Sequence, residues 1–154
     1  EVRYTHMRVR AVMEDVPLSF HPETTYEEAA TLLCRHELSG APVLDAVGAV
    51  VGMVSEKDLF RVLYPFYKSF YESPDAYTDF ESRESKAQEI RLHPVSSFMT
   101  SQVITVTPDT PLMRAGALML AHHIHMLPVV EKGLLVGILR RGVLYRSVLR
   151  KNFP

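Results

Sequence analysis

Hydrophobic and polar positions follow the same order along the two halves of the chain. A short apolar segment that runs toward a proline predicts a strand at residues 16–20 and again at 103–107. A helix start follows each segment, where Thr24 or Thr25 can cap the first helix and Thr110 the second. Apolar residues three and four positions apart then give each helix one buried stripe. Each half therefore begins with a strand and a helix.

A hairpin and a second helix complete each half. Gly48 and Gly133 mark tight turns between apolar segments, and leucines at helical spacing follow, among them Leu59 and Leu144. The predicted hairpin strands are residues 41–45, 49–54, 127–131 and 134–139. The predicted fold class is therefore a mixed α/β (α+β) arrangement of two units, each ordered strand, helix, strand, strand, helix.

The two halves also align residue by residue. With one residue deleted from the second copy, the alignment pairs Met13 with Met99, Pro22 with Pro108, His36 with His122, Pro42 with Pro128, Gly52 with Gly137 and Leu59 with Leu144. A unit of about fifty residues is too small to bury a good core alone. We therefore expect a tandem pair that shares one core.

Composition agrees with a compact protein and narrows its partners. The 154 residues are 47% hydrophobic and 23% charged, and the formal net charge is -1, which argues against bulk electrostatic binding to nucleic acid or to an anionic membrane. No apolar run approaches the ~20 residues that span a bilayer. The single cysteine, Cys34, cannot form an internal disulfide and is expected to be buried in the helix stripe, so a reducing cytoplasm is the simplest compartment.

Several short stretches resemble the signature segments of one known family. They are SGAPVLD at 39–45, GMVSEKDL at 52–59, Met99-Thr100, Thr107-Pro108-Asp109 and HMLPVV at 125–130. These resemble the CBS (cystathionine beta-synthase) domain, over about residues 8–64 and 95–150, with 65–94 as a linker. The resemblance implies a Bateman module, in which two pseudo-symmetric CBS units pack through their sheets and leave a cleft on each side.

The resemblance also implies a function. Such modules commonly bind adenine nucleotides or related adenosyl ligands and act as sensors, so AMP, ADP or ATP is expected, with S-adenosylmethionine as a further candidate. A homodimer and a regulated partner protein that the sequence does not identify are expected as well. No cofactor, metal, membrane or nucleic-acid partner is expected. No catalytic residue is assigned, because the sequence shows no Ser/His/Asp arrangement, paired carboxylates or Walker-type phosphate loop.

The expected ligand cleft draws on both copies. Asp58 can accept hydrogen bonds from the ribose hydroxyls, Ser55 and the amides of the helix start can donate to phosphate, and Lys57 adds positive charge. Met53 and Ile104 could enclose the adenine. The resemblance places the remaining cleft residues on the second copy, at Val103, Ile104, Thr105, His125, Met126 and Leu127. His125 stands where related subunits of AMP-activated kinases have a phosphate-contacting histidine.

A simpler interpretation of the same residues stays open. Ser55 and Asp58 also form an ordinary capping arrangement for a helix start, and Lys57 can be a solvated charge. Met53 and Ile104 can be core residues.

The second copy departs from this pattern at the corresponding positions. Arg140 replaces Ser55 and Val143 replaces Asp58, and a valine cannot accept a hydrogen bond from a ribose. The weaker second cleft would be formed by Leu18, Ser39, Gly40, Ala41 and Arg140. Arg140 and Arg141 either bind phosphate by charge or face solvent beside an empty cleft. We expect the second outcome and one good site per chain.

The remaining groups allow several interpretations. His122 and His125 could share a helix face and bind a metal, but no Cys or carboxylate lies nearby in sequence to complete the set. The linker 65–94 opens with aromatic residues, so its first part is expected to be helical and packed on the module or on a partner. Leu59, Val62, Leu144 and Val148 could form a dimer contact or lie inside one chain.

Three classes of function follow from these patterns. The first is a sensor of an adenine nucleotide. The second is a ligand-free pair that acts in dimerisation or protein interaction. The third is a metal-dependent or histidine-based enzyme, for which the sequence supplies almost nothing.

Overall fold

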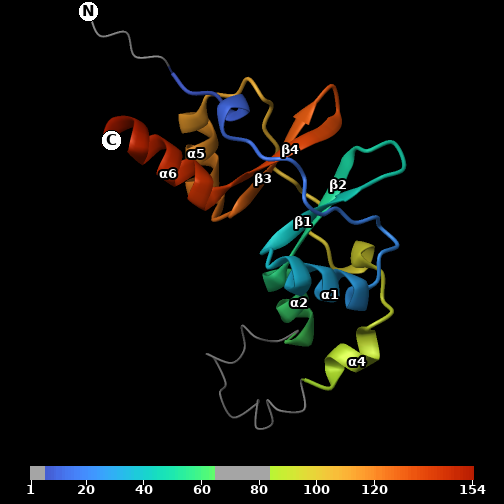
Figure 1. Cartoon of the computed structure of the whole chain (residues 1–154). Coiled ribbons are helices and arrows are strands. Elements are labelled where there is room, and N and C mark those ends of the chain that lie inside the picture. Colours follow the sequence, from blue (N-terminus) through green and yellow to red (C-terminus); the bar gives the residue numbers. More distant parts are fainter. Residues whose placement is uncertain (1–5, 65–83) are drawn as a thin grey trace, which may run out of the picture. The chain divides into compact units, whose positions relative to one another are not determined.

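The chain has a mixed fold of helices and two small sheets, as the sequence predicts. The computed structural model describes residues 6–64 and 84–154 (Figure 1). In chain order the elements are η1 (Val9–Ala11), α1 (Tyr26–His36), β1 (Gly40–Leu44), β2 (Val50–Ser55), α2 (Glu56–Leu63), α4 (Lys86–Ile90), η4 (Val95–Ser97), α5 (Leu112–His122), β3 (Met126–Glu131), β4 (Leu134–Arg140) and α6 (Arg141–Asn152). β1 pairs with β2, and β3 pairs with β4. None of the helices in these two ranges combines the length and apolar character needed to cross a membrane.

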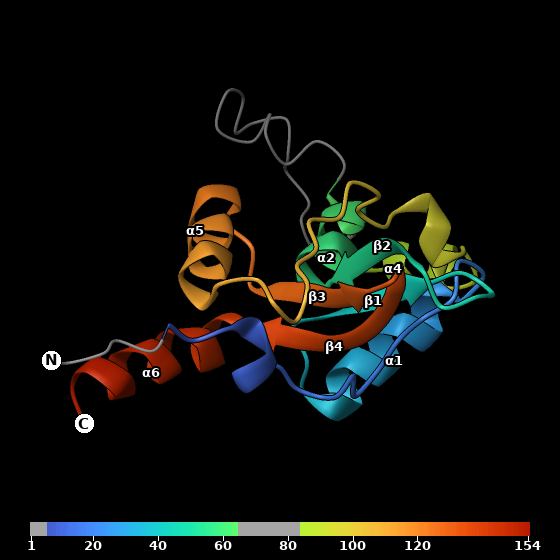
Figure 2. The same cartoon turned by 90° about the horizontal axis from the view of Figure 1, so that it is seen from above.

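The chain divides into two compact units that do not coincide with the two sequence copies. The first-copy unit comprises segments 18–45 and 51–101, and the second-copy unit comprises segments 1–17, 46–50 and 102–154. Each unit therefore includes the segment that leads into the other copy. The N-terminal segment, drawn in blue, runs beside β4 of the second-copy unit in both Figure 1 and Figure 2.

Backbone pairing fixes each leading segment to the hairpin of its unit. Glu14 and Ile138 exchange two N–H···O bonds of 2.8 and 2.9 Å, and Met53 and Thr100 exchange two bonds of 2.9 Å. The two pairs are equivalent, because Glu14 aligns with Thr100 and Ile138 aligns with Met53. The duplication thus preserves how the leading segments are held.

Two aligned glycines allow this close approach. A Cβ at Gly137 would lie 2.9 Å from the backbone oxygen of Glu14, and a Cβ at Gly52 would overlap the side chain of Met99. A larger residue at Gly137 would push the leading segment away from the hairpin, and one at Gly52 would displace the side chain of Met99. The repeated Met and Gly of the sequence therefore have a shared packing role.

The strands predicted at 16–20 and 103–107 are wrong in extent, since each is reduced to a single parallel bridge. The amide of Phe20 donates to Pro42 at 2.9 Å, and the amide of Leu44 donates to Phe20 at 2.8 Å. Pro42 has no N–H to extend this ladder. The same bonds recur at Val106, Pro128 and Val130 in the second copy.

The first helices of the two copies begin differently. At α1, Thr25 and Glu28 form a capping box, in which the Glu28 amide donates to Thr25 Oγ1 at 3.2 Å. The prediction that Thr110 caps α5 is wrong, because its hydroxyl accepts from the Thr107 amide at 3.0 Å and closes a turn. Pro111 occupies the N-cap position and offers no side-chain acceptor.

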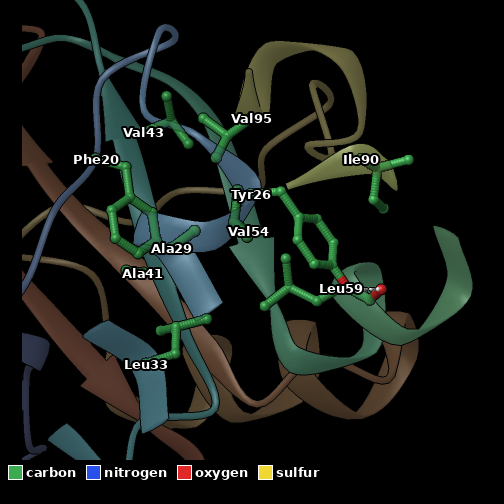
Figure 3. Packing of buried hydrophobic residues seen from close by; sticks show 10 residues of the cluster. All are labelled: Phe20, Tyr26, Ala29, Leu33, Ala41, Val43, Val54, Leu59, Ile90 and Val95. Carbon is green, nitrogen blue, oxygen red and sulfur yellow. Dashed lines mark hydrogen bonds between the residues drawn. The ribbon is translucent and has the colours of Figure 1, made fainter. Parts of the chain in front are cut away.

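Most of the buried hydrophobic residues form two clusters, one in each unit, where a single shared core was expected. Figure 3 shows the cluster of the first-copy unit around Phe20, Leu33 and Val54, with the Tyr26 hydroxyl donating to the Leu59 carbonyl at 2.8 Å. The second cluster comprises Val9, Val106, Leu112, Ala115, Met119, Leu127, Val129, Leu139 and Leu144. Each unit completes its own core because it takes in a segment from outside its copy.

Several sequence expectations about single side chains are now decided. Leu59 and Leu144 lie inside their own clusters, and Val62 and Val148 pack against them. Leu59 and Leu144 therefore serve the core of one chain, while a dimer contact through the half-buried Val62 and Val148 stays a prediction. Cys34 is exposed, contrary to the prediction, because it follows the buried Leu33 and so points to another side of α1.

The end of the linker packs on the first-copy unit. Ile90 of the linker and Val95, which follows the linker, are buried in its core, and the amide of Tyr26 donates to the His93 carbonyl at 2.8 Å. The aromatic part of the linker, for which a helix was predicted, lies in 65–83, outside the described residues.

Candidate functional site

The start of α2 carries the most tightly organised polar cluster of the first-copy unit. The amide and hydroxyl of Ser55 donate to Asp58 Oδ2 at 2.9 and 3.0 Å, and the Asp58 amide donates back to Ser55 Oγ at 3.1 Å. This is a complete capping box. Asp58 is only 7% exposed, and no other charged residue in the described ranges is buried.

The other carboxylate oxygen of Asp58 is held less firmly. Arg61 Nη1 and Thr100 Oγ1 both approach Oδ1 at 3.4 Å. Charge-assisted hydrogen bonds are usually near 2.7–2.9 Å, so both contacts are weak. One oxygen therefore holds the helix cap, while the other has acceptor capacity to spare.

Sequence reasoning missed Arg61 and Thr100. The signal for Arg61 was readable, since it follows Asp58 by one helical turn and forms an ion pair with it. Thr100 is far along the chain and reaches Asp58 only because its segment pairs with Met53. No local pattern indicates such a contact.

The other residues expected from the first copy surround this cluster. Lys57 is exposed in the first turn of α2, and Met53 is half-buried on β2. The structure thus brings Met53, Ser55 and Asp58 together with Thr100.

The residues expected from the second copy belong to the second-copy unit. Thr105 and His125 are exposed, while Val103 and Ile104 are half-buried, and Ile104 packs against the core. The buried Met126 and Leu127 complete the set. Only Thr105 and His125 therefore present polar side chains to the surface.

The start of α6 corresponds to the start of α2, but it has a different polar arrangement. Arg140 Nε donates to Glu14 Oε1 at 2.7 Å, and Arg140 Nη2 donates to Glu14 Oε2 at 2.6 Å. The hydrogen bonds from Arg140 to Glu14 are the main reason that the pKa of Arg140 is raised; burial lowers it, and the charge of Glu14 raises it further. Arg140 is therefore engaged in an ion pair that neither sequence alternative included.

The remaining residues of the weaker second cleft lie in the first-copy unit. Gly40 and Ala41 are buried, Leu18 is half-buried, and the carbonyl of the exposed Ser39 accepts from the Glu56 amide at 2.9 Å. A Cβ at Gly40 would lie 2.9 Å from the Val54 carbonyl, so this position is restricted to glycine.

Two other features of the described surface do not coincide with the expected site. Within residues 6–64 and 84–154, no three His, Cys, Asp or Glu side chains gather as metal ligands, and the cluster at His122 is no exception. A hollow of about 560 Å³ lies between residues 6–8, the start of α5 and the end of α6. None of its lining residues is an expected ligand contact, and none is a carboxylate that could accept a hydrogen bond from a ribose as Asp58 can.

Comparison with known proteins gives the family and the fold. The sequence model of the CBS domain matches residues 9–65 and 95–150. The uncharacterized protein MJ1426 of Methanocaldococcus jannaschii is 28% identical over 156 residues, which cover 93% of this chain and 92% of that protein. The A-adding tRNA nucleotidyltransferase of Aquifex aeolicus is 24% identical over 146 residues; the match covers 95% of this chain but only 15% of that enzyme.

A solved structure agrees with the same assignment. The crystal structure of CBSX2 in complex with AMP is 28% identical and superposes with a TM-score of 0.70, over 94% of this chain and 98% of that one. CBSX2 is a CBS-pair protein from Arabidopsis thaliana. Because the family match covers most of the sequence in two separate segments, this chain belongs to the CBS domain family and carries two copies of the domain in tandem.

Proposed function

We propose that this CBS pair is a regulatory sensor of an adenine nucleotide or related adenosyl ligand. AMP, ADP or ATP is the first candidate and S-adenosylmethionine a further one. The observation that carries the proposal is the split role of Asp58, whose Oδ2 is fixed by Ser55 and whose Oδ1 has only two contacts of 3.4 Å. The likeness to CBSX2, solved with AMP, supports the choice of ligand.

The proposed binding step uses Asp58 Oδ1 as the acceptor for ribose. A ribose hydroxyl would replace the long contacts from Arg61 and Thr100, while the Ser55 cap would stay in place. The carboxylate is already oriented, so little side-chain entropy is lost on binding. Recognition would therefore not require α2 to unfold at its first turn.

The second-copy unit would supply the remaining contacts. In this proposal Thr105 and His125 meet the phosphate, and the backbone of 103–105 and 125–127 lines the base, because Met126 and Leu127 have buried side chains. A ligand that contacts residues of both units favours one arrangement of them, and that preference is what a regulated partner protein would sense. We assign the chain no catalytic role.

Calorimetric titration of AMP and ATP into the wild type, Asp58→Ala and Thr25→Ala tests the proposal. Thr25 belongs to an equivalent capping box at α1 in the same unit, so Thr25→Ala controls for the disruption of a capping box. We expect the wild type and Thr25→Ala to bind about one nucleotide per chain and Asp58→Ala to lose binding. Equal binding by all three proteins would exclude Asp58 as a ligand contact, and binding by none would exclude nucleotide sensing.

A second candidate function is a ligand-free pair that acts by dimerisation. It is favoured by exposed apolar side chains on two helices that pack together, namely Met113 and Leu120 on α5 and Leu149 on α6. Sedimentation of the wild type, Leu120→Glu and the control Leu92→Glu tests it, since Leu92 is a comparably exposed leucine outside α5 and α6. A tight dimer that only Leu120→Glu disrupts, together with no nucleotide binding, would favour this function.

A further inference from the structure

The acidic residue near the start of the second helix has different positions in the two copies. In the first copy the acid is Asp58 on the helix, and the leading segment offers the neutral Thr100. In the second copy the leading segment offers the acid, Glu14, and the helix start offers Arg140. Glu14 aligns with Thr100, so the carboxylate has moved from the helix to the segment that packs against it.

The carboxylate of Glu14 binds the guanidinium of Arg140 in the way that a phosphate would. Both carboxylate oxygens are engaged, by Nε at 2.7 Å and by Nη2 at 2.6 Å, which is a bidentate arrangement. Carboxylate and phosphate oxygens use the same planar fork of arginine. A ligand phosphate that approached Arg140 along this edge would have to displace Glu14.

The carboxylate of Glu14 is held close to Arg140 by the backbone. Glu14 exchanges two backbone hydrogen bonds with Ile138, two residues before Arg140 on the same stretch of chain. A tethered carboxylate competes at a high effective concentration with a free phosphate. The side chains of Glu14 and Arg140 are 35% and 47% exposed, so the ion pair itself need not be strong. Glu14 competes with phosphate because the backbone keeps it beside Arg140.

The charges around the start of α6 explain why an acid is favoured there. α6 has no acidic residue in its first turn and no side-chain cap, and Arg141 follows Arg140 directly. The guanidinium of Arg146 also lies near this turn, since a Cβ at Gly142 would be 2.9 Å from Arg146 Nη1. The positive end of the helix dipole adds to these three cations. Glu14 supplies the one anion that contacts this group in the described part of the chain.

We infer that Glu14 is a specificity-determining residue that excludes phosphorylated ligands from the second-copy helix start. It acts as an internal substitute for phosphate, so that nucleotide binding is restricted to the Asp58 half of the molecule. This inference rests on the proposed nucleotide site for its meaning, but it concerns residues that the first-copy site does not use.

Titration of ATP and of inorganic pyrophosphate into the wild type and Glu14→Thr tests the inference. Threonine is the residue that the first copy has at the aligned position, so the backbone pair with Ile138 is expected to be retained. Glu14→Gln, which keeps the size of the side chain and removes its charge, is the second variant. We expect both variants to gain pyrophosphate binding and to bind one more ATP per chain than the wild type, held through its phosphates because Val143 offers the ribose no acceptor.

A double variant assigns the gained site. Glu14→Thr combined with Arg140→Ala should lose the additional ATP and pyrophosphate, while Arg140→Ala alone should bind ATP as the wild type does. No gain in either Glu14 variant, or a gain that survives Arg140→Ala, would overturn the inference. If the wild type binds no ATP, the proposed function fails, while pyrophosphate binding that requires both the loss of Glu14 and the presence of Arg140 would still support the inference.

Discussion

The starts of α2 and α6 occupy equivalent places in the repeat and are stabilised in different ways. α2 begins with a side-chain cap and a buried acid, whereas α6 begins with arginines, no side-chain cap and an ion pair to the preceding segment. The backbone pairs that hold the leading segments are nevertheless the same in both copies. Packing constraints thus kept the fold of both copies alike, while the polar residues at the two helix starts diverged.

The largest expected effect comes from the aligned glycines. Gly137→Ala would bring a Cβ within 2.9 Å of the Glu14 backbone oxygen, whereas Gly52→Ala would meet the flexible side chain of Met99. Backbone yields less easily than a methionine tip, so we expect Gly137→Ala to lower the free energy of unfolding by about 2–3 kcal/mol and Gly52→Ala by about 1 kcal/mol. Urea denaturation measures both. An equal or reversed order would contradict the packing role assigned to Gly137.

The next effect compares the helix caps. Asp58→Val copies the second-copy residue into the first, removes the carboxylate half of the capping box, and leaves Ser55, Arg61 and Thr100 without their acceptor. We expect a loss of about 2 kcal/mol in the free energy of unfolding. Val143→Ala, at the aligned position, should cost about 1 kcal/mol, since Val143 is half-buried and forms no cap. Thermal unfolding of both variants checks this order.

A smaller effect concerns the hydroxyl of Tyr26. The aligned residue in the second copy, Leu112, has no hydroxyl. Tyr26→Phe removes the 2.8 Å bond to the Leu59 carbonyl and should cost about 1 kcal/mol. Burial raises the pKa of Tyr26 above its usual 10.0. Its contribution is therefore complete below pH 10.0 and is lost as pH rises through the higher pKa of the folded state. The free energy of unfolding, measured at increasing alkaline pH, should fall more steeply for the wild type than for Tyr26→Phe.

The smallest effect is expected for the Glu14–Arg140 pair. The side chains of Arg140 and Glu14 are both more than a third exposed, at 47% and 35%. Arg140→Ala should therefore lower the free energy of unfolding by only about 0.5–1 kcal/mol. Added salt should reduce this cost. Denaturation at low and high salt measures it. A loss above about 2 kcal/mol would mean that the pair is mainly structural and would weaken its proposed role in ligand selection.

Periodicity and repeat alignment were sufficient to predict the two helices and the hairpin of each copy, and the family followed from the resemblance of short segments. They overestimated the strands at 16–20 and 103–107, because Pro42 and Pro128 on the partner strands have no N–H to continue the ladder. They missed the two separate cores, since the exchange of leading segments is a long-range feature without a local pattern.

The candidate site was predictable where it is local. The Ser55–Asp58 cap follows from spacing alone, and the departure at Arg140 was visible in the alignment. The partners Thr100 and Glu14 were not predictable as contacts, because each reaches its helix through pairing between distant segments. The two residues that complete the polar clusters are therefore the ones that required a structure.

The central claim is that nucleotide binds at the Asp58 cluster and not at the start of α6. An NMR titration of AMP into isotope-labelled protein, followed through backbone amide signals, tests it most directly. We predict large shifts at Ser55, Asp58 and Thr100 and small ones at Glu14 and Val143; the Arg141 amide donates to the His125 carbonyl at 2.9 Å and would respond to a ligand at either place. Shifts of equal size at both helix starts, or at neither, would contradict the account.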